Sequence, residues 1–264
     1  MHIQLDTLAY SNRLRHLPPA QKLYFALALL LLASIAHYPV QIVIFGWMSI
    51  WIVIYAGIPY RIYGSMILGV MTFLATSMLA LAVESNSTAQ AIQADSLWHL
   101  SVWGGEIYLS RQGSIQAIAV LIRSLASTAA LFSIVLTIPA IDLAIAGKKA
   151  GFPPIAIELS LLVYRFIFLL ADTAQKIVTA QVSRGGYRTH RLRLNSLNLL
   201  VRQLIGRTAS RYQQLTLGVK ARGFQQEFRF WHPQSYQYSR RYARESIWGY
   251  LVLVVGEIFY RNYV

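Results

Sequence analysis

The chain has 264 residues, of which 56% are hydrophobic and 13% charged, and it contains no cysteine. Its mean hydropathy of +0.45 and its few charges exclude an ordinary soluble domain, in which about 25% of residues are charged. The absence of cysteine excludes disulfides, thiolate metal ligands and cysteine nucleophiles. We therefore expect a membrane protein.

Five apolar stretches follow one another along the chain as candidate membrane spans. Crossing the roughly 30 Å of hydrocarbon in a bilayer takes roughly 20 mostly apolar residues. Residues 40–60, 62–83 and 115–138 reach that length, and residues 23–38 and 247–260 are shorter. The sequence thus predicts an all-α polytopic membrane protein with about five transmembrane helices.

Basic residues predict the orientation of these spans, because Lys and Arg accumulate in cytoplasmic loops. Three of them precede the first span, and Arg61 separates the second from the third. The connection over residues 84–114 carries three acids and Arg111 as its only Lys or Arg, so it is expected outside. We predict a multi-pass protein of the cell (inner or plasma) membrane with a cytoplasmic N-terminus.

Arg123 lies eight residues into the fourth span. A charge at this depth usually faces protein or water, which makes Arg123 a structural or coupling candidate. Alternatively, its long side chain reaches the outer interface and has no further role. Both interpretations stay open.

Residues 139–243 form a basic block with 16 Lys or Arg and 4 Asp or Glu, which accounts for 12 of the 14 net positive charges. We predict three parts: N-terminal transmembrane helices 1–4 over residues 1–138, cytoplasmic coupling helices over 139–243, and a C-terminal transmembrane helix over 244–264. A pI near 10.2 would in a soluble protein suggest nucleic acid. Without an aromatic platform or a known motif, we expect the lipid bilayer and no nucleic acid as a partner.

The block begins with helix-breaking residues and continues as a long apolar helix. Pro139 ends the fourth span, residues 147–151 break the chain, and Pro153 precedes a helix expected over residues 155–181. On it, acidic and basic residues alternate at intervals of seven: Glu158, Arg165 and Asp172. This stripe indicates charges that face other protein, or alternatively a helix end at the lipid surface.

A second helix is expected over residues 192–220. Apolar residues recur along it in steps of three and four, while Arg207 and Arg211 share another face. It is therefore amphipathic and basic rather than a membrane span. Such a helix either lies on anionic headgroups or presents its end to a partner protein.

Both helices of the block end in the same dipeptide after a small residue. The two sequences, 38 residues apart, are Ser183-Arg184-Gly185 and Ala221-Arg222-Gly223. Glycine accepts the left-handed conformation that stops a helix, and arginine is a favourable cation at that end and projects beyond it. An ordinary helix cap explains one such end more readily than two in succession.

These two tripeptides resemble the paired Ala-Arg-Gly coupling motifs of the T component of energy-coupling-factor (ECF) transporters, the CbiQ/EcfT family. The Thr137-Ile138-Pro139 segment is similar to its Thr-Thr-Pro signature, residues 151–153 to its Gly-x-Pro, and residues 164–166 to its Tyr-Arg-aromatic element. The resemblance covers roughly residues 13–224. Ser183 in place of alanine and Ile138 in place of threonine are its departures.

The resemblance implies a membrane scaffold that joins two cytosolic ABC-type ATPases to a substrate-binding membrane subunit, either an S component or a metal-binding CbiM-like protein. It further implies that Arg184 and Arg222 each enter a groove of one ATPase. Overall similarity favours cobalt or nickel as the cargo, and a vitamin is the alternative. Uptake of cobalt would serve cobalamin biosynthesis. We expect no cofactor on this chain, with ATP and Mg on the partner subunits.

We expect no enzyme activity, because no phosphate-binding loop is present. The nearest approach, Gly147-Lys148-Lys149, lacks the first glycine and the hydroxyl residue of that motif. The six histidines are scattered, so we expect no catalytic residue and no metal site. Two alternatives remain open: a membrane-embedded enzyme acting on lipid, and a membrane anchor for a partner that is not an ATPase.

Overall fold

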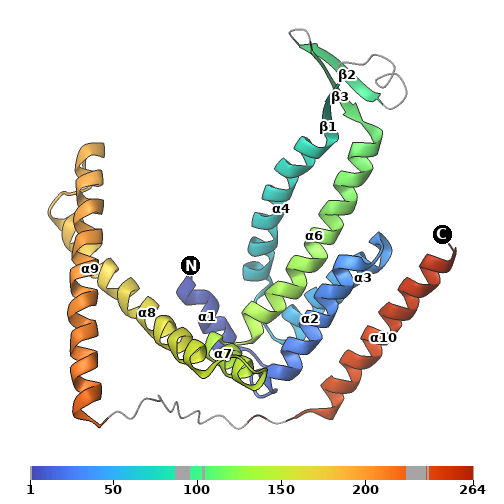
Figure 1. Cartoon of the computed structure of the whole chain (residues 1–264). Coiled ribbons are helices and arrows are strands. Elements are labelled where there is room, and N and C mark those ends of the chain that lie inside the picture. Colours follow the sequence, from blue (N-terminus) through green and yellow to red (C-terminus); the bar gives the residue numbers. More distant parts are fainter. Residues whose placement is uncertain (1, 87–95, 103–104, 224–235, 237, 264) are drawn as a thin grey trace. The chain divides into compact units, whose positions relative to one another are not determined.

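The computed structural model describes residues 2–263, except for residues 87–95, 103–104, 224–235 and 237. The chain divides into two compact units, which are described separately below. The first comprises Met1–Pro139 with Ser235–Val264, and the second comprises Ala140–Gln234. Figure 1 shows that long helices make up most of both units, so the prediction of an all-α membrane protein is confirmed.

The first unit is a helical bundle built around one long helix, α6 (Figure 1). This helix contacts α1, α2, α3 and α4. The bounds of the helices are α1 His2–Ser11, α2 Pro19–Ile35, α3 Tyr38–Ile50 with a π-helical turn η1 Trp51–Tyr55, α4 Tyr60–Ala82, α6 Arg111–Thr137 and α10 Arg240–Tyr263.

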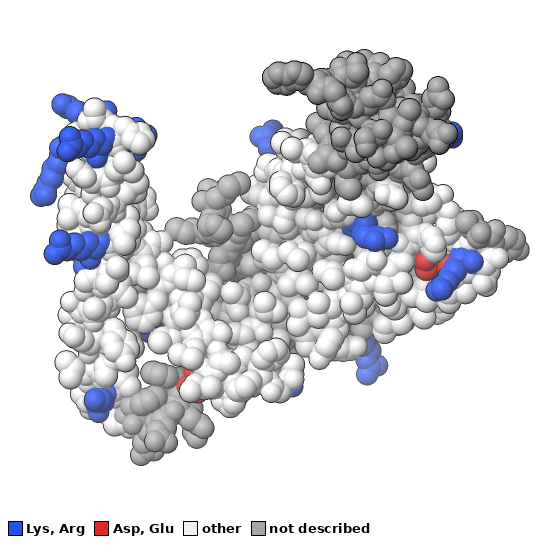
Figure 2. Space-filling view, turned by 45° about the horizontal axis from the view of Figure 1, so that its top comes forward, with Lys and Arg blue, Asp and Glu red and all other residues white. Residues whose placement is uncertain are grey.

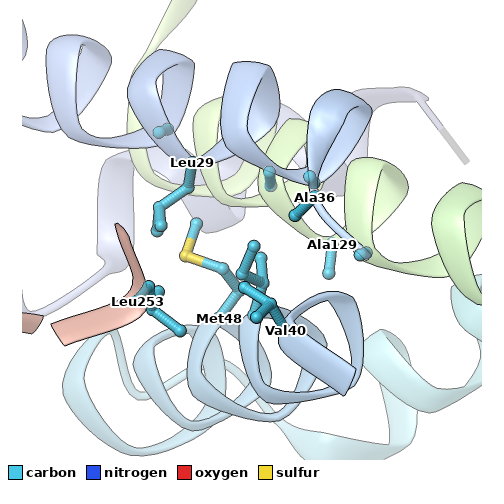
Figure 3. Packing of buried hydrophobic residues seen from close by; sticks show 11 residues of the cluster. Leu29, Ala36, Val40, Met48, Ala129 and Leu253 are labelled. Atoms are coloured by element: carbon cyan, nitrogen blue, oxygen red, sulfur yellow. The ribbon is translucent and has the colours of Figure 1, made fainter. Parts of the chain in front are cut away.

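The core of this unit combines small residues with long aliphatic ones. Ala26 and Ala33 of α2 and Ala126, Ala129 and Ala130 of α6 are all buried, and alanines allow two helix backbones to approach closely. Larger side chains fill the space toward α3 and α10, where Figure 3 shows them meeting side by side: Leu29, Val40, Met48 and Leu253.

Helix α10 packs against α3 through Gly249. A Cβ added at Gly249 would lie 1.9 Å from the ring of Trp47, so only glycine leaves room for that indole. At the far end of α10, Glu257 accepts a hydrogen bond from the backbone N–H of His37 and lies 2.6 Å from its Nδ1 atom. Helix α10 begins at Arg240, seven residues before the expected apolar stretch.

A small antiparallel sheet lies in the connection between α4 and α6, where the sequence analysis expected only a loop. Its strands are β1 Val83–Asn86, β2 Ser96–Val102 and β3 Gly105–Ser110, in the order β1-β3-β2. Leu109 of β3 pairs with Val83 on one side and with Trp98 on the other. Residues 98–102 alternate apolar and polar, which is the period typical of a strand.

The second unit consists of α7 Ala140–Lys149, α8 Pro154–Ser183 and α9 His190–Ala221. The expected break over residues 147–151 is wrong in its first part, because α7 continues through Gly147 and Ala150 still donates to the Ala146 carbonyl at 3.1 Å. A single glycine inside a helix costs only about 1 kcal/mol. The chain turns at Gly151, whose φ of +93° is left-handed.

Among the described residues, three helical segments are long and apolar enough to cross a membrane: Tyr38–Tyr55, Gly113–Thr137 and Pro154–Ser183. Two of them coincide with predicted spans, and α2 is a shorter apolar helix. The third is α8, which the sequence analysis assigned to the cytoplasmic block. The number of spans and the orientation of the termini stay predictions.

Candidate functional site

The end of α8 is closed by two backbone hydrogen bonds around Gly185. The N–H of Gly185 donates to the Val182 carbonyl and the N–H of Gly186 donates to the Gln181 carbonyl, both at 2.9 Å. With Gly185 at φ +73°, this pair of bonds is a Schellman motif, which satisfies carbonyls left free at a helix end. Arg184 caps the helix, and its side chain is exposed.

The end of α9 has the same geometry. Gly223 is left-handed at φ +69°, and its N–H donates to the Lys220 carbonyl, three residues earlier, at 3.1 Å. The N–H of Gly185 makes the corresponding bond to the Val182 carbonyl. The capping arginines agree closely, with φ/ψ of −90°/9° at Arg184 and −92°/11° at Arg222. Ser183, Ala221 and Arg222 are exposed as well. The six residues of the two motifs therefore form two equivalent, accessible helix ends.

The first of these ends is also joined to the start of α9 by a set of side-chain hydrogen bonds, which we call the elbow bracket. Gln181 donates from Nε2 to the Ser196 carbonyl at 3.0 Å and accepts from the Tyr187 hydroxyl at 3.0 Å. The Ser196 hydroxyl donates to the Gly186 carbonyl at 2.8 Å. Gln181 and Ser196 are each only 9% exposed.

Gly186 is needed at the centre of the elbow bracket for steric reasons. A Cβ at this position would lie 2.6 Å from the Ser196 hydroxyl oxygen and 3.1 Å from the Gln181 carbonyl oxygen. The residues of the elbow bracket were not predicted from the sequence. The only signal was the second glycine after Arg184, because the pairing of Gln181 with Ser196 spans two helices.

In the charged stripe of α8, Asp172 binds Lys176 of the same helix at 2.7 Å. Whether the stripe faces another protein or the lipid surface stays a prediction. Arg165 is exposed, and no described residue forms an ion pair or hydrogen bond with it. Pro153 is the N-cap of α8, with Pro154 in the first turn as the sequence predicted.

Thr137 and Pro139 lie at a buried helix end in the first unit. The Thr137 carbonyl accepts from Lys22 Nζ at 2.8 Å and from Asn12 Nδ2 at 3.2 Å. Lys22, only 8% exposed, also donates to the Leu14 carbonyl at 3.2 Å. A cation at the C-terminus of α6 is stabilised by the helix dipole. The sequence analysis had counted Lys22 only as a cytoplasmic charge.

Arg123 is exposed on α6, inside the candidate span Gly113–Thr137. Within the described part of the chain, no side chain or carbonyl is hydrogen-bonded or ion-paired to it. An Arg123→Leu variant separates the two interpretations, because a residue that only reaches for the interface would tolerate leucine without loss of transport.

The described residues contain no group of three or more His, Cys, Asp or Glu side chains that could hold a metal ion. His37 and Glu257 form a pair, with Nδ1 and Oε1 2.6 Å apart, and not a group of three. Positive charge, in contrast, is concentrated. Helix α9 carries six Lys or Arg and no acid, and Figure 2 shows blue atoms distributed along its length at the left.

The sequence of the chain is similar to that of known transport proteins. The model of a family described as CbiQ, cobalt transport protein, matches residues 10–231. The cobalt transport protein CbiQ of Rhodobacter capsulatus is 30% identical over 226 residues, covering 85% of this chain and 86% of the relative. The CbiQ protein of Salmonella typhimurium is 28% identical over 235 residues, covering 85% and 98%.

A third relative, from Methanocorpusculum labreanum, is named as a putative fused cobalt transport protein CbiMQ. It is 28% identical over 221 residues. The matched region is 83% of this chain but only 36% of the relative. That protein therefore extends well beyond the region that matches this chain.

Proposed function

The chain belongs to the CbiQ family of cobalt transport proteins, and on that basis we propose that it is the energy-coupling T component of an ATP-driven ECF-type importer. Its coarser role, a membrane component of cobalt transport, follows from the family and from the apolar helices. The finer role is a scaffold that passes the motions of two ATPases to a substrate-binding membrane subunit.

One observation carries this proposal: the two exposed helix ends at Arg184 and Arg222 have the same backbone conformation. Two equivalent ends fit two partner subunits of one kind, each receiving one arginine. A planar guanidinium that projects beyond a helix end forms paired hydrogen bonds with a carboxylate or with carbonyl groups. The Schellman motif at Gly185 fixes the direction in which that arginine leaves the helix.

Two observations support the proposed partners: the sequence has no phosphate-binding loop, and one relative is named as a fused CbiMQ protein. The sequence contains no phosphate-binding loop, so ATP and Mg are assigned to the partner ATPases and this chain is proposed to be no enzyme. The fused relative named CbiMQ supports a CbiM-like membrane partner, because fusion places two such proteins in fixed proportion. That partner, rather than this chain, would bind the metal.

The magnitude of the effect can be worked out for either arginine. Removing one member of a buried interfacial charge pair costs roughly 2 to 5 kcal/mol. Each 1.4 kcal/mol is a tenfold change in the dissociation constant, so the loss is about 30-fold to several thousand-fold per site. Both sites contribute to one complex, so the double variant should assemble more weakly than either single variant.

The decisive experiment is co-purification of the chain with candidate ABC-type ATPase subunits from the same organism. We expect Arg184→Ala and Arg222→Ala each to weaken the complex or to uncouple ATP hydrolysis from uptake. Arg202→Ala is the matched control, because it removes one exposed arginine from the middle of α9. Unchanged assembly, ATPase activity and uptake in both end variants would refute the proposal. So would an active purified chain alone, which the enzyme alternative requires.

Cobalt is the proposed cargo, with nickel or a vitamin as alternatives. The described residues contain no metal cluster. We therefore propose that the membrane partner determines which cargo is transported. Uptake of radioactive cobalt by cells that express the complete complex, compared with nickel and with vitamins, distinguishes these cargoes. Vitamin uptake without cobalt uptake would contradict the assignment of cobalt.

A further inference from the structure

Helices α8 and α9 enclose a groove along their facing sides. The groove has a volume of about 360 Å³ between Phe166, Leu169 and Leu170 of α8 and Arg207 and Arg211 of α9. It continues into a second hollow of about 600 Å³, which shares Phe166, Leu169 and Arg211 with the first. In the first hollow the α8 wall is mostly apolar, and the α9 wall carries both arginines beside Thr208, Ser210 and Gln214.

The cations of the groove have no acidic partner within it. Arg207 and Arg211 are four residues apart on α9, so they lie on the same helix face. Arg165 borders the second hollow from α8. The single acid there, Asp172, is bound by Lys176 at 2.7 Å, and no described residue pairs with any of the three arginines. The groove thus has an excess of positive charge.

The apolar wall is part of a larger uncovered surface. Helix α8 is long and apolar enough to cross a membrane, yet only Leu161, Ile177 and Gln181 along it are buried in the structure. Val163 and Ile167, which continue the surface beyond the groove, are each 55% exposed. Exposed apolar area on this scale marks a contact with lipid or with another protein.

We propose that the groove binds one anionic phospholipid. Its phosphate lies between Arg207 and Arg211, within reach of Arg165, and an acyl chain lies along Phe166 and Leu169. Arginine forks match phosphate geometry, and basic pockets between helices are a recognised way to hold acidic lipid headgroups. A phospholipid matches both walls at once, whereas a soluble phosphate leaves the apolar wall uncovered.

A phospholipid also accounts better than an acidic protein segment for the continuous apolar surface of α8. An acidic segment would neutralise the arginines over a few residues, but the uncovered surface extends past the groove on the same helix. In a chain that belongs to a membrane, lipid is the solvent for such a surface. The apolar surface of α8 would contact any lipid, and the arginines of the groove would select lipids with an anionic headgroup.

The test measures lipid retention by the full-length chain. The protein is reconstituted in phosphatidylcholine nanodiscs with increasing phosphatidylglycerol, and bound lipid is counted by native mass spectrometry after gentle release. The Arg207→Gln/Arg211→Gln variant is compared with Arg191→Gln/Arg193→Gln, which removes the same charge from exposed positions near the start of α9, outside the groove.

We expect the groove variant to bind phosphatidylglycerol about 25-fold more weakly, which corresponds to roughly fivefold per arginine near an acidic lipid. The control variant should retain its lipid. If the double variant does not fold, as judged by gel filtration and circular dichroism, Arg211→Gln alone should still show the fivefold loss.

Three results would overturn the proposal. Equal losses in both variants would mean a diffuse surface charge and no site. Equal retention of phosphatidylcholine and phosphatidylglycerol would mean that the headgroup is not recognised. Displacement by millimolar inorganic phosphate, with no dependence on acyl chains, would mean a soluble anion instead. Because lipid retention is measured on this chain alone, the outcome is independent of any ATPase partner.

Discussion

Replacing Gly186 by alanine is predicted to open the junction between α8 and α9. The new Cβ would lie 2.6 Å from the Ser196 hydroxyl oxygen and 3.1 Å from the Gln181 carbonyl oxygen. Both distances are shorter than ordinary contacts, and the second involves backbone that cannot rotate away. The Ser196 hydroxyl has to move first, and it then loses its 2.8 Å hydrogen bond to the Gly186 carbonyl.

The size of the effect follows from these two contacts. A lost hydrogen bond costs about 0.5 to 1.5 kcal/mol, and forcing extra volume into a packed site costs about 1 to 3 kcal/mol. We therefore expect the junction to lose about 2 to 4 kcal/mol. Gly185→Ala is the matched comparison. Its φ of +73° costs alanine about 1 to 2 kcal/mol, but its Cβ would be a comfortable 3.5 Å from Arg188.

The assay is amide hydrogen exchange of the full-length chain in detergent micelles. The N–H groups of Gly185 and Gly186 are hydrogen-bonded at 2.9 Å, so their exchange reports local opening of the junction. Gly186→Ala should lower the opening free energy more than Gly185→Ala does. Adding Ser196→Ala to Gly186→Ala should restore part of the loss, because it removes the nearer of the two clashes and the two residues are in contact.

Two results would refute this reasoning. Exchange of the junction amides that is unchanged by Gly186→Ala would mean that the backbone moves aside at little cost. Losses from Ser196→Ala and Gly186→Ala that simply add would mean that the clash with the hydroxyl is not the cause. In either case the elbow bracket would not hold the first helix end.

Three further substitutions test other contacts. Lys22→Met leaves the Thr137 and Leu14 carbonyls without their charged donor, so thermal unfolding in micelles should show a loss of about 1.5 to 3 kcal/mol; unchanged stability would contradict the helix-capping role. Gly249→Leu places side-chain atoms where the Trp47 ring lies, so cross-linking between α10 and α3 should fall and Trp47→Ala should restore it. The chain has no cysteine of its own to complicate that measurement. Asp172→Asn removes an exposed pair with Lys176 and should cost less than about 0.5 kcal/mol; a loss above 1 kcal/mol would mean that Asp172 has another partner.

Local rules were enough to predict the two helix ends from the sequence. Glycine after a basic residue at the end of a periodic stretch indicates a left-handed cap, and Gly185 and Gly223 both have it. The starts of the helices obey similar rules, as Pro153 and Pro154 show at the start of α8. Features decided within one helical turn are visible in the residues themselves.

Features that depend on two separated segments were missed. Gln181 and Ser196 are both polar residues on long helices, and nothing in either helix indicates that they meet. Lys22 likewise looks like a flanking charge until α6 ends beside it. Strands β1 and β3 are distant in the sequence and pair only in the folded chain. Their short sequences alone were therefore not enough to predict a sheet. In each case tertiary contact, not local preference, decides the structure.

The near-identity of the two capping conformations has a consequence for the number of genes that such a complex needs. Arg184 and Arg222 leave their helices with backbone angles that agree within 2°. Under the proposed function, two copies of one ATPase would therefore meet the same cap conformation at both ends. Two copies of a short cap within one chain would let that asymmetric chain bind a symmetric dimer. Any difference in how the two halves of the dimer are bound would then come from residues outside the two tripeptides.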